Sequence, residues 1–419
     1  MRRGPPNRDA DAVRFRLLPP GATDDAAGLL QTRAIRALGD GTVSVVLAAY
    51  LSSLGLSDTR IGVVVTVTLL GSAALTLAVG LRAHAYPRRK LLRLVSLLMM
   101  ATGIGFAAFT GFWPLALVGM IGTLNPSGGD VSVFLPTEQA LLPATVDDHH
   151  RTALFARYSL LGTLVAALGA AMAGLPEWIA HRLDIADVTA LRWTFVGYAG
   201  LGAVVFMRYS HLSPAIEPAA RTTRHALGES KQTVYRLAAL FSLDAFGGGF
   251  VITALVVLWL QHRFGLSLAV SGAVFFWAGL FAAFSQLAAV RLAARIGLVR
   301  TMVFTHLPAN GLLILTAFMP NAPLAVACLL GRSALSQMDV PARTSYVMAV
   351  VSPEERPAAA SVTNVPRSLA SALPPIAAGW MLSRSTFGWP LIIGGTLKAI
   401  YDLLLLQQFR HVRPPEEVR

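Results

Sequence analysis

Twelve apolar segments, each long enough to cross a membrane as a helix, constrain this chain more than any other feature of its sequence. One crossing takes roughly 20 apolar residues. The segments are too continuous for the alternating pattern of a membrane barrel, and charged residues make up only 14% of the chain. We therefore predict an all-α integral membrane protein and exclude a soluble enzyme. The segments lie at 33–54, 61–80, 91–112, 114–141, 152–174, 190–207, 236–261, 267–290, 301–319, 323–350, 358–382 and 389–408.

The basic residues indicate how the chain is oriented. With the N-terminus placed inside, 25 of the 35 Lys and Arg residues fall in inside segments and 5 in outside segments. Cytoplasmic loops of membrane proteins carry such an excess of Lys and Arg. We expect a multi-pass protein of the cell (plasma or inner) membrane with both termini in the cytoplasm. The same distribution accounts for the net charge of +13 without a nucleic-acid partner.

The longest polar stretch within the apolar body divides the chain in two. It covers residues 208–235 and is rich in arginine and proline. We interpret it as a cytoplasmic linker between an N-terminal six-helix bundle at 29–207 and a C-terminal six-helix bundle at 236–409. Loose cytoplasmic tails are expected at 1–28 and 410–419.

The two halves resemble each other in sequence. The stretch YLSSLGLSDTRIG at 50–62 matches LQHRFGLSLAVSG at 260–272. Intramembrane aspartates also correspond, Asp40 with Asp244 and Asp130 with Asp339. Repeated bundles with a site at their interface suit alternating access, in which one half rocks against the other. The predicted fold is therefore a pair of pseudo-symmetric six-helix bundles.

The chain resembles the major facilitator superfamily of secondary transporters over nearly its whole length. That family has twelve spans, a six-plus-six repeat and the loop signature GxLaDRxGRR between spans two and three. Here the loop reads GLRAHAYPRRK, in which Gly80, Arg88 and Arg89 match and His84 replaces the aspartate. The resemblance implies that spans one, four, seven and ten line a central cavity and that this loop takes part in gating. The stretches DVPARTSYVMAVVSPEER and TNVPRSLASALPP resemble a bacterial and fungal subgroup.

Four aspartates in the cavity spans are candidates for carrying protons. A charged side chain at the bilayer centre costs at least about 2.5–3.5 kcal/mol, so such residues usually have a function or a partner. Asp40, Asp244, Asp130 and Asp339 are therefore candidates for proton coupling or for contact with the substrate. For Asp40 the alternative is a structural ion pair with Arg36, one helical turn earlier.

Further polar residues accompany these aspartates. An arginine that faces a cavity can bind a carboxylate or a phosphate with two hydrogen bonds, or it can neutralise the aspartates, and both interpretations stay open here. The stretch NPSGGD at 125–130 predicts a break in the fourth span, and broken helices are where transporters often bind ligands. The candidates for substrate contact are Arg36, Asn125, Arg332, Gln337, Asn364 and Arg367.

Two charged residues at equivalent places of the repeat are candidates for a gate. Glu138 and Arg343 lie near the cytoplasmic ends of spans four and ten, where a salt bridge between them would close the inner side. Lys398 and Asp402 in span twelve are four residues apart, and we expect them to form a self-neutralising structural pair. His306 in span nine is expected to be a satisfied core residue.

These features together predict a secondary active transporter of a small molecule that works by alternating access. The leading hypothesis is proton-coupled efflux of an amphiphilic or cationic compound, because acidic residues outnumber what proton binding needs. The alternatives are transport of an anionic metabolite by the cavity arginines, and a non-transporting membrane receptor or lipid-handling protein. We expect no catalytic site, no metal, no cofactor beyond a proton gradient, and a monomer in the lipid bilayer.

Overall fold

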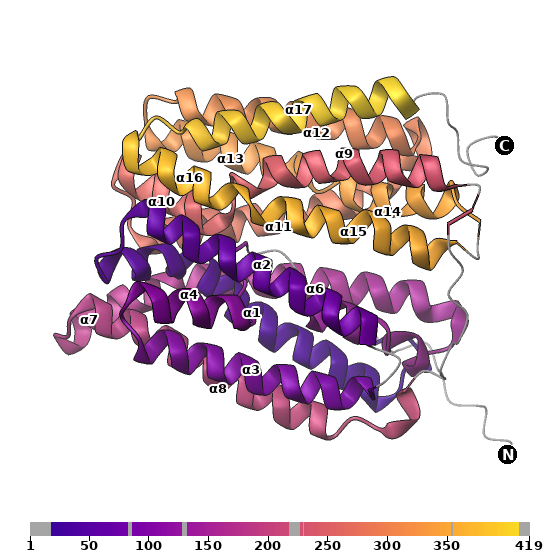
Figure 1. Ribbon diagram of the computed structural model, residues 1–419, viewed down its shortest axis with the longest axis horizontal. Helices are drawn as coiled ribbons and strands as arrows, with labels where there is room; N and C mark the ends of the chain where they lie inside the picture. The colour runs from indigo at the N-terminus through magenta and orange to yellow at the C-terminus, as the bar shows by residue number, and fades with distance from the viewer. Residues whose placement is uncertain are drawn as a thin grey trace, which may run out of the picture.

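The protein is a bundle of long helices. The computed structural model describes residues 18–82, 86–127, 132–217, 227–228, 230–352 and 355–409, and throughout these ranges the regular structure is helical. The helices run side by side along the longest axis in two groups, one early and one late in the chain (Figure 1). A helix satisfies its own backbone polar groups, which is what a lipid solvent requires. The predicted all-α fold of two halves is confirmed.

The first bundle extends from Asp24 to Ser210. Its α-helices are α1 (Asp24–Ser53), α2 (Asp58–Arg82), α3 (Arg88–Ala108), α4 (Phe112–Ile121), α5 (Phe134–Gln139), α6 (Arg151–Ala171), α7 (Leu175–Leu183) and α8 (Asp187–Ser210). Short 3₁₀ helices join some of them, namely η1 (Leu142–Thr145), η2 (Asp148–His150) and η3 (Met172–Gly174).

The second bundle extends from Lys231 to Phe409, and the 3₁₀ helix η4 (Pro214–Ile216) lies between the two. Its helices are α9 (Lys231–Gly249), α10 (Thr253–Phe264), α11 (Leu268–Ile296), α12 (Leu298–Phe318), α13 (Ala322–Ser336), α14 (Asp339–Ala349), α15 (Arg356–Ala372), α16 (Pro374–Arg384) and α17 (Trp389–Phe409).

These helices make twelve crossings. In the described part of the chain, nine helical stretches are long and apolar enough to cross a membrane. The other three crossings each consist of two successive helices, namely α4 with α5, α13 with α14, and α15 with α16. The last break follows from the sequence, because Pro374 and Pro375 open α16 and proline disfavours helix at the residue before it.

The two bundles pack their helices in the same way. In the first, α1 lies against α6 and α3 against α8; in the second, α9 lies against α15 and α12 against α17. Contacts between the bundles are also paired, since α2 packs on α15 and α16 while α6 packs on α11. The repeat seen in the sequence therefore recurs in the tertiary packing.

Two glycines that match in the repeat have the same backbone conformation. Gly55, after α1, has a φ of +81°, and Gly265, after α10, has a φ of +66°. Positive φ is the left-handed region that glycine adopts without steric cost. The matched glycines thus end equivalent helices in both halves.

The bundles are joined at one end of the molecule. We call the end where α1 begins and α17 ends the terminal end, and the opposite one the far end (Figure 1). At the far end the amide of Leu268 donates to Glu177 at 3.1 Å, and His262 Nδ1 lies 3.5 Å from Asp58 Oδ2. The backbone at Gly62 also touches that of α16. These contacts hold the two bundles together on the side remote from the termini.

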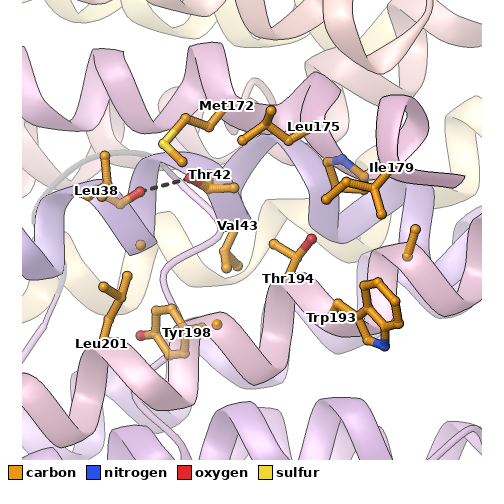
Figure 2. Close-up of a pocket in the computed structure, with 14 residues that line it drawn as sticks. Leu38, Thr42, Val43, Met172, Leu175, Ile179, Trp193, Thr194, Tyr198 and Leu201 are labelled. Carbon is orange, nitrogen blue, oxygen red and sulfur yellow. Dashed lines mark hydrogen bonds between the residues drawn. The ribbon is translucent and has the colours of Figure 1, made fainter. Parts of the chain in front are cut away.

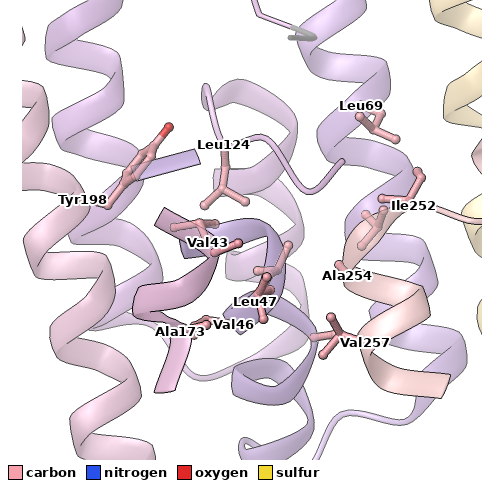
Figure 3. Packing of buried hydrophobic residues seen from close by; sticks show 14 of the residues in the cluster. Val43, Val46, Leu47, Leu69, Leu124, Ala173, Tyr198, Ile252, Ala254 and Val257 are labelled. Atoms are coloured by element: carbon pink, nitrogen blue, oxygen red, sulfur yellow. The ribbon is translucent and has the colours of Figure 1, made fainter. Parts of the chain in front are cut away.

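An apolar seam continues from the far end toward the middle. Figure 3 shows Val43, Val46 and Leu47 of α1 beside Ala254 and Val257 of α10. All five side chains are at most 5% exposed. Side chains of both halves therefore share one core, and the charged residues described next lie outside it.

Candidate functional site

Buried charged residues gather in two clusters, one in each bundle. The first-half cluster consists of Thr32, Arg36, Glu138, Tyr158 and Tyr209. The second-half cluster consists of Asp244, His306, Asn310, Asp339, Arg343, Lys398 and Asp402. Every one of these side chains is buried, so each charge needs a partner within the protein.

Glu138, on α5, is the centre of the first-half cluster. Its carboxylate accepts hydrogen bonds from Thr32 Oγ1 at 2.7 Å, from the Tyr209 hydroxyl at 2.5 Å and from the Tyr158 hydroxyl. Arg36 of α1 adds an ion pair to the same carboxylate. One buried acid thereby joins α1, α5, α6 and α8, which indicates a structural role at the terminal end of the first bundle.

Arg36 is held in place from a second side. Its guanidinium carbon lies 4.4 Å from the centre of the Phe134 ring, a distance at which a cation is attracted to an aromatic face. Arg36 forms an ion pair with Glu138, and Asp40 accepts a hydrogen bond from the Tyr198 hydroxyl at 3.3 Å. The gate predicted between Glu138 and Arg343 stays a prediction, because Glu138 is bonded here within its own bundle.

Asp244, on α9, is the centre of the second-half cluster. It lies 13 residues after the helix begins, or about 20 Å along it at a rise of 1.5 Å per residue. Lys398 Nζ donates to Asp244 Oδ1 at 2.5 Å, and Arg343 Nη1 lies 3.3 Å from Oδ2. Arg343 also pairs with Asp339, one turn earlier on α14. Two cations thus face Asp244, and in this arrangement it is an ion-paired carboxylate.

The structure corrects the interpretation of span twelve. Lys398 forms its ion pair with Asp244 rather than with Asp402. Asp402 Oδ1 lies 2.9 Å from His306 Nδ1, and Oδ2 accepts from Asn310 Nδ2 at 2.8 Å. The reason is that α17 packs against both α9 and α12, so successive turns of one helix face meet different neighbours. His306 is buried and hydrogen-bonded, as expected of a satisfied core residue, and it contacts two carboxylates.

Two further arginines lie beside this cluster. Arg332, on α13, and Arg367, on α15, are within electrostatic reach of Asp244. The Nε of each is buried and has no hydrogen-bond partner among the described residues. Both side chains nevertheless remain partly exposed. An arginine in this situation has donors available for an anion.

The other predicted contact residues lie at two helix breaks and on α15. Asn125 follows α4 and is buried, and its Oδ1 accepts from the Ser127 amide at 3.1 Å and from the Ser127 hydroxyl at 2.7 Å. Gln337 ends α13 at its break, and Asn364 is an exposed residue of α15. Asp130, predicted as a proton-coupling residue, lies outside the described residues.

Asp40 lies beside an apolar cavity of the first bundle. The cavity has a volume of about 290 Å³ and lies between α1, α7 and α8 (Figure 2). Tyr198, which donates to Asp40, lines it together with Trp193 and Thr194. A Cβ at Gly41 would collide with the Ala166 carbonyl, so this glycine brings α6 close to α1 next to Asp40.

The loop signature has a structural role at the terminal end. The amides of Arg88 and Arg89, which open α3, donate to the Glu217 carboxylate at 3.0 and 2.9 Å. A carboxylate at a helix N-terminus satisfies free amides and opposes the positive end of the helix dipole. Gly80 lies near the end of α2, and His84 lies outside the described residues. A gating role for this loop stays a prediction.

The family model of the Major Facilitator Superfamily matches residues 31–242 and 237–419. The chain belongs to the Major Facilitator Superfamily. An uncharacterized membrane protein of Saccharomyces cerevisiae is 24% identical to it over 410 residues, covering 90% of this chain and 92% of the yeast protein.

Solved structures of other transporters share the Major Facilitator Superfamily fold described above. A bacterial homologue of the human lysosomal transporter Spinster, inward-facing and occupied, aligns with a TM-score of 0.75 and 16% identity over 94% of this chain and 99% of its own. The nucleoside transporter NupG aligns with a TM-score of 0.70 and 14% identity, covering 93% of this chain and 100% of its own. A D-xylose–proton symporter aligns with a TM-score of 0.71 and 15% identity, covering 91% of this chain and 96% of its own. Membership of this superfamily identifies the chain as a membrane transporter and not an enzyme.

The sequence alone did not predict some members of the two clusters, and it assigned others to the wrong partner. Tyr158 and Tyr209 carry no signal that distinguishes them from other tyrosines in apolar spans. His306 and Lys398 did carry one, because each is an ionisable residue within a predicted span. That signal was outweighed by the expectation that spans nine and twelve lie at the periphery.

Proposed function

We propose that this chain is a proton-coupled secondary active transporter of anionic small molecules. The observation that carries the proposal is the pair Arg332 and Arg367, whose buried Nε atoms have no hydrogen-bond partner among the described residues. Arginine binds carboxylates and phosphates through two parallel hydrogen bonds. Two such groups beside one cluster fit a dicarboxylate or a phosphate monoester. Contacts that join the bundles at the far end support alternating access by rocking of the halves.

The balance of charge favours an anion over a cation. The expectation of a cationic substrate depended on a surplus of acidic residues. Glu138 is paired with Arg36, Asp339 with Arg343, and Asp244 with both Lys398 and Arg343. These three carboxylates are therefore already neutralised by the protein's own cations, and Arg332 and Arg367 add two further positive charges beside the second-half cluster.

Proton coupling is proposed to reside in the second-half cluster. Here three carboxylates, a histidine and two cations lie within hydrogen-bond or ion-pair distance of one another. Adding a proton to such a network changes its net charge next to Arg332 and Arg367. Asp40 and Asp130 of the first half remain proposed contributors to proton coupling.

We also propose that both termini lie in the cytoplasm, as the distribution of basic residues predicts.

A second candidate function is efflux of an amphiphilic cation. It is favoured by the apolar cavity of about 290 Å³ beside Tyr198, the tyrosine that donates to Asp40. A lipophilic cation in that cavity would find an apolar wall and one nearby carboxylate. The two candidates use different halves of the protein, so one screen separates them.

The test is a thermal-shift screen of the purified protein against dicarboxylates, organic phosphates, sugars, amino acids and tetraphenylphosphonium, followed by flux in proteoliposomes. A ligand at 100 times its dissociation constant stabilises the folded state by about 2.7 kcal/mol. Replacement of Arg332 or Arg367 by Gln should weaken anion binding tenfold or more, since hydrogen bonds to charged groups contribute about 1.5–3 kcal/mol. Arg384→Gln, at an exposed far-end position, is the matched control.

The outcomes separate the hypotheses. An anion that shifts the melting temperature of the wild type and the control, but not of the Arg332 and Arg367 variants, supports the proposal. A response to tetraphenylphosphonium that disappears in Asp40→Asn would replace it with cation efflux. If vesicles containing only this protein accumulate none of the compounds that bind, a receptor or lipid-handling role becomes the better conclusion.

A further inference from the structure

His306 lies between two buried carboxylates from different helices. Its Nδ1 is 2.9 Å from Asp402 Oδ1, and its Nε2 is 3.8 Å from Asp244 Oδ1. The imidazole side chain is 3% exposed. A histidine whose two ring nitrogens each face a carboxylate is placed to bind a proton, because an imidazolium donates from both nitrogens.

The hydrogen bonds of Asp402 indicate which nitrogen of the neutral imidazole carries the hydrogen. With Asp402 ionised, the short contact places a hydrogen on Nδ1, because an ionised carboxylate only accepts hydrogen bonds. Asn310 Nδ2 lies 3.2 Å from Nδ1 as well, and with that hydrogen in place it donates to the other oxygen of Asp402 at 2.8 Å. In the neutral imidazole the lone pair is then on Nε2, which faces Asp244. The proton adds at this lone pair, and no other bond forms or breaks.

One of the two carboxylates that face the ring has no ion pair with a permanent cation in the described part of the chain. Asp244 and Asp339 are paired with Lys398 and Arg343, whereas Asp402 is hydrogen-bonded to the imidazole and to Asn310 among the described residues. With a neutral imidazole the charge of Asp402 therefore has no cationic partner within the described ranges. A proton on His306 supplies one, which is a large change in a buried site where charges are weakly screened.

Ionisable groups of several helices surround the ring. Asp244 of α9 faces Nε2 and Asp402 of α17 faces Nδ1, and the centre of the Tyr401 ring, also on α17, lies 6.1 Å from that of the imidazole. Arg343 of α14 and Lys398 of α17 are paired with Asp244, and Arg332 of α13 and Arg367 of α15 lie within electrostatic reach of the same carboxylate.

We propose that His306 is the proton-binding residue of this transporter and that Asp402 and Asp244 hold it. The proposal extends the function proposed above, because it names the atom that takes up the coupled proton. A protonated His306 adds a positive charge to the cluster beside Arg332 and Arg367, which favours an anion bound there. Proton and anion therefore bind together, and the linkage is that of a symporter.

The first test needs no substrate. Nitrogen-15 NMR of histidine-labelled protein should show one buried imidazole that titrates between about pH 5 and 8, the range in which histidine commonly changes charge. This signal should be absent in His306→Gln, whose amide still donates to Asp402, and present in the control His181→Gln, at an exposed position of α7. If His306 keeps one protonation state throughout that range, the proposal is wrong.

The second test uses sulfate, an anion that keeps its charge over this pH range. Sulfate added to weakly buffered wild-type protein should cause proton uptake, detected with an indicator dye. His306→Gln should bind sulfate without proton uptake, whereas His181→Gln should behave as the wild type. Proton uptake in His306→Gln equal to that of the wild type would overturn the proposal. A titrating His306 in a protein that does not bind sulfate would instead count against the anionic substrate and leave the proton site standing.

Discussion

Glu138→Gln should strongly destabilise the first bundle. The substitution keeps the shape of the side chain and one acceptor oxygen for Thr32 and Tyr209, but it leaves the charge of Arg36 buried beside a neutral amide. Arg36 is 1% exposed, so water cannot replace the lost carboxylate. Removing one partner of a buried ion pair costs about 3–5 kcal/mol. Since 1.4 kcal/mol is about tenfold, the ratio of folded to unfolded protein should fall by more than a hundredfold.

A second substitution distinguishes this explanation from simple loss of packing. In the double variant Arg36→Met with Glu138→Gln, the cluster contains no charge, so most of the lost stability should return. Equilibrium unfolding in mixed detergent micelles measures all three proteins. Asp187→Asn, an exposed carboxylate in the first turn of α8, is the matched control and should cost less than about 1 kcal/mol. The reasoning is refuted if Glu138→Gln loses less than 1 kcal/mol, or if the double variant is no more stable than the single one.

Two other predictions concern the contacts that define the described arrangement. Gly62→Leu should separate the bundles at the far end, because a side chain there would collide with the Pro375 carbonyl. Distances between spin labels at the far ends of α2 and α16 should therefore lengthen. The control Gly80→Leu should leave these distances unchanged, because a side chain at Gly80 meets open space. The Ser230 hydroxyl and neighbouring amides hold the pKa of Glu355 below its usual value. Glu355→Gln should therefore melt at a lower temperature than the wild type at pH 7. This difference in melting temperature should shrink as the pH falls below about 4.3, because the wild-type carboxyl then becomes protonated. A difference in melting temperature that does not depend on pH would contradict this prediction.

The candidate site was only partly predictable from the sequence. The cost of placing a charge in lipid identified Asp244, Asp339, Arg332 and Arg367 as residues of interest. It did not identify their partners. Lys398 was assigned to Asp402 because the two lie one turn apart, whereas the structure pairs it with Asp244 from another helix. Pairing across helices depends on how each helix is rotated about its axis, and spans apolar on all sides contain little information about that rotation.

The sequence by itself determined the solvent, the number of crossings and the twofold organisation of this protein. Segments of about 20 apolar residues can satisfy their backbone in lipid only as helices, and the repeat around Gly55 and Gly265 required two similar halves. Only the tertiary structure decided which buried charges meet. Glu138 is bonded within the first bundle, and His306 lies between Asp244 and Asp402 of the second. The physical reason is that burial fixes how many charges need partners, whereas helix packing fixes which partners lie within reach.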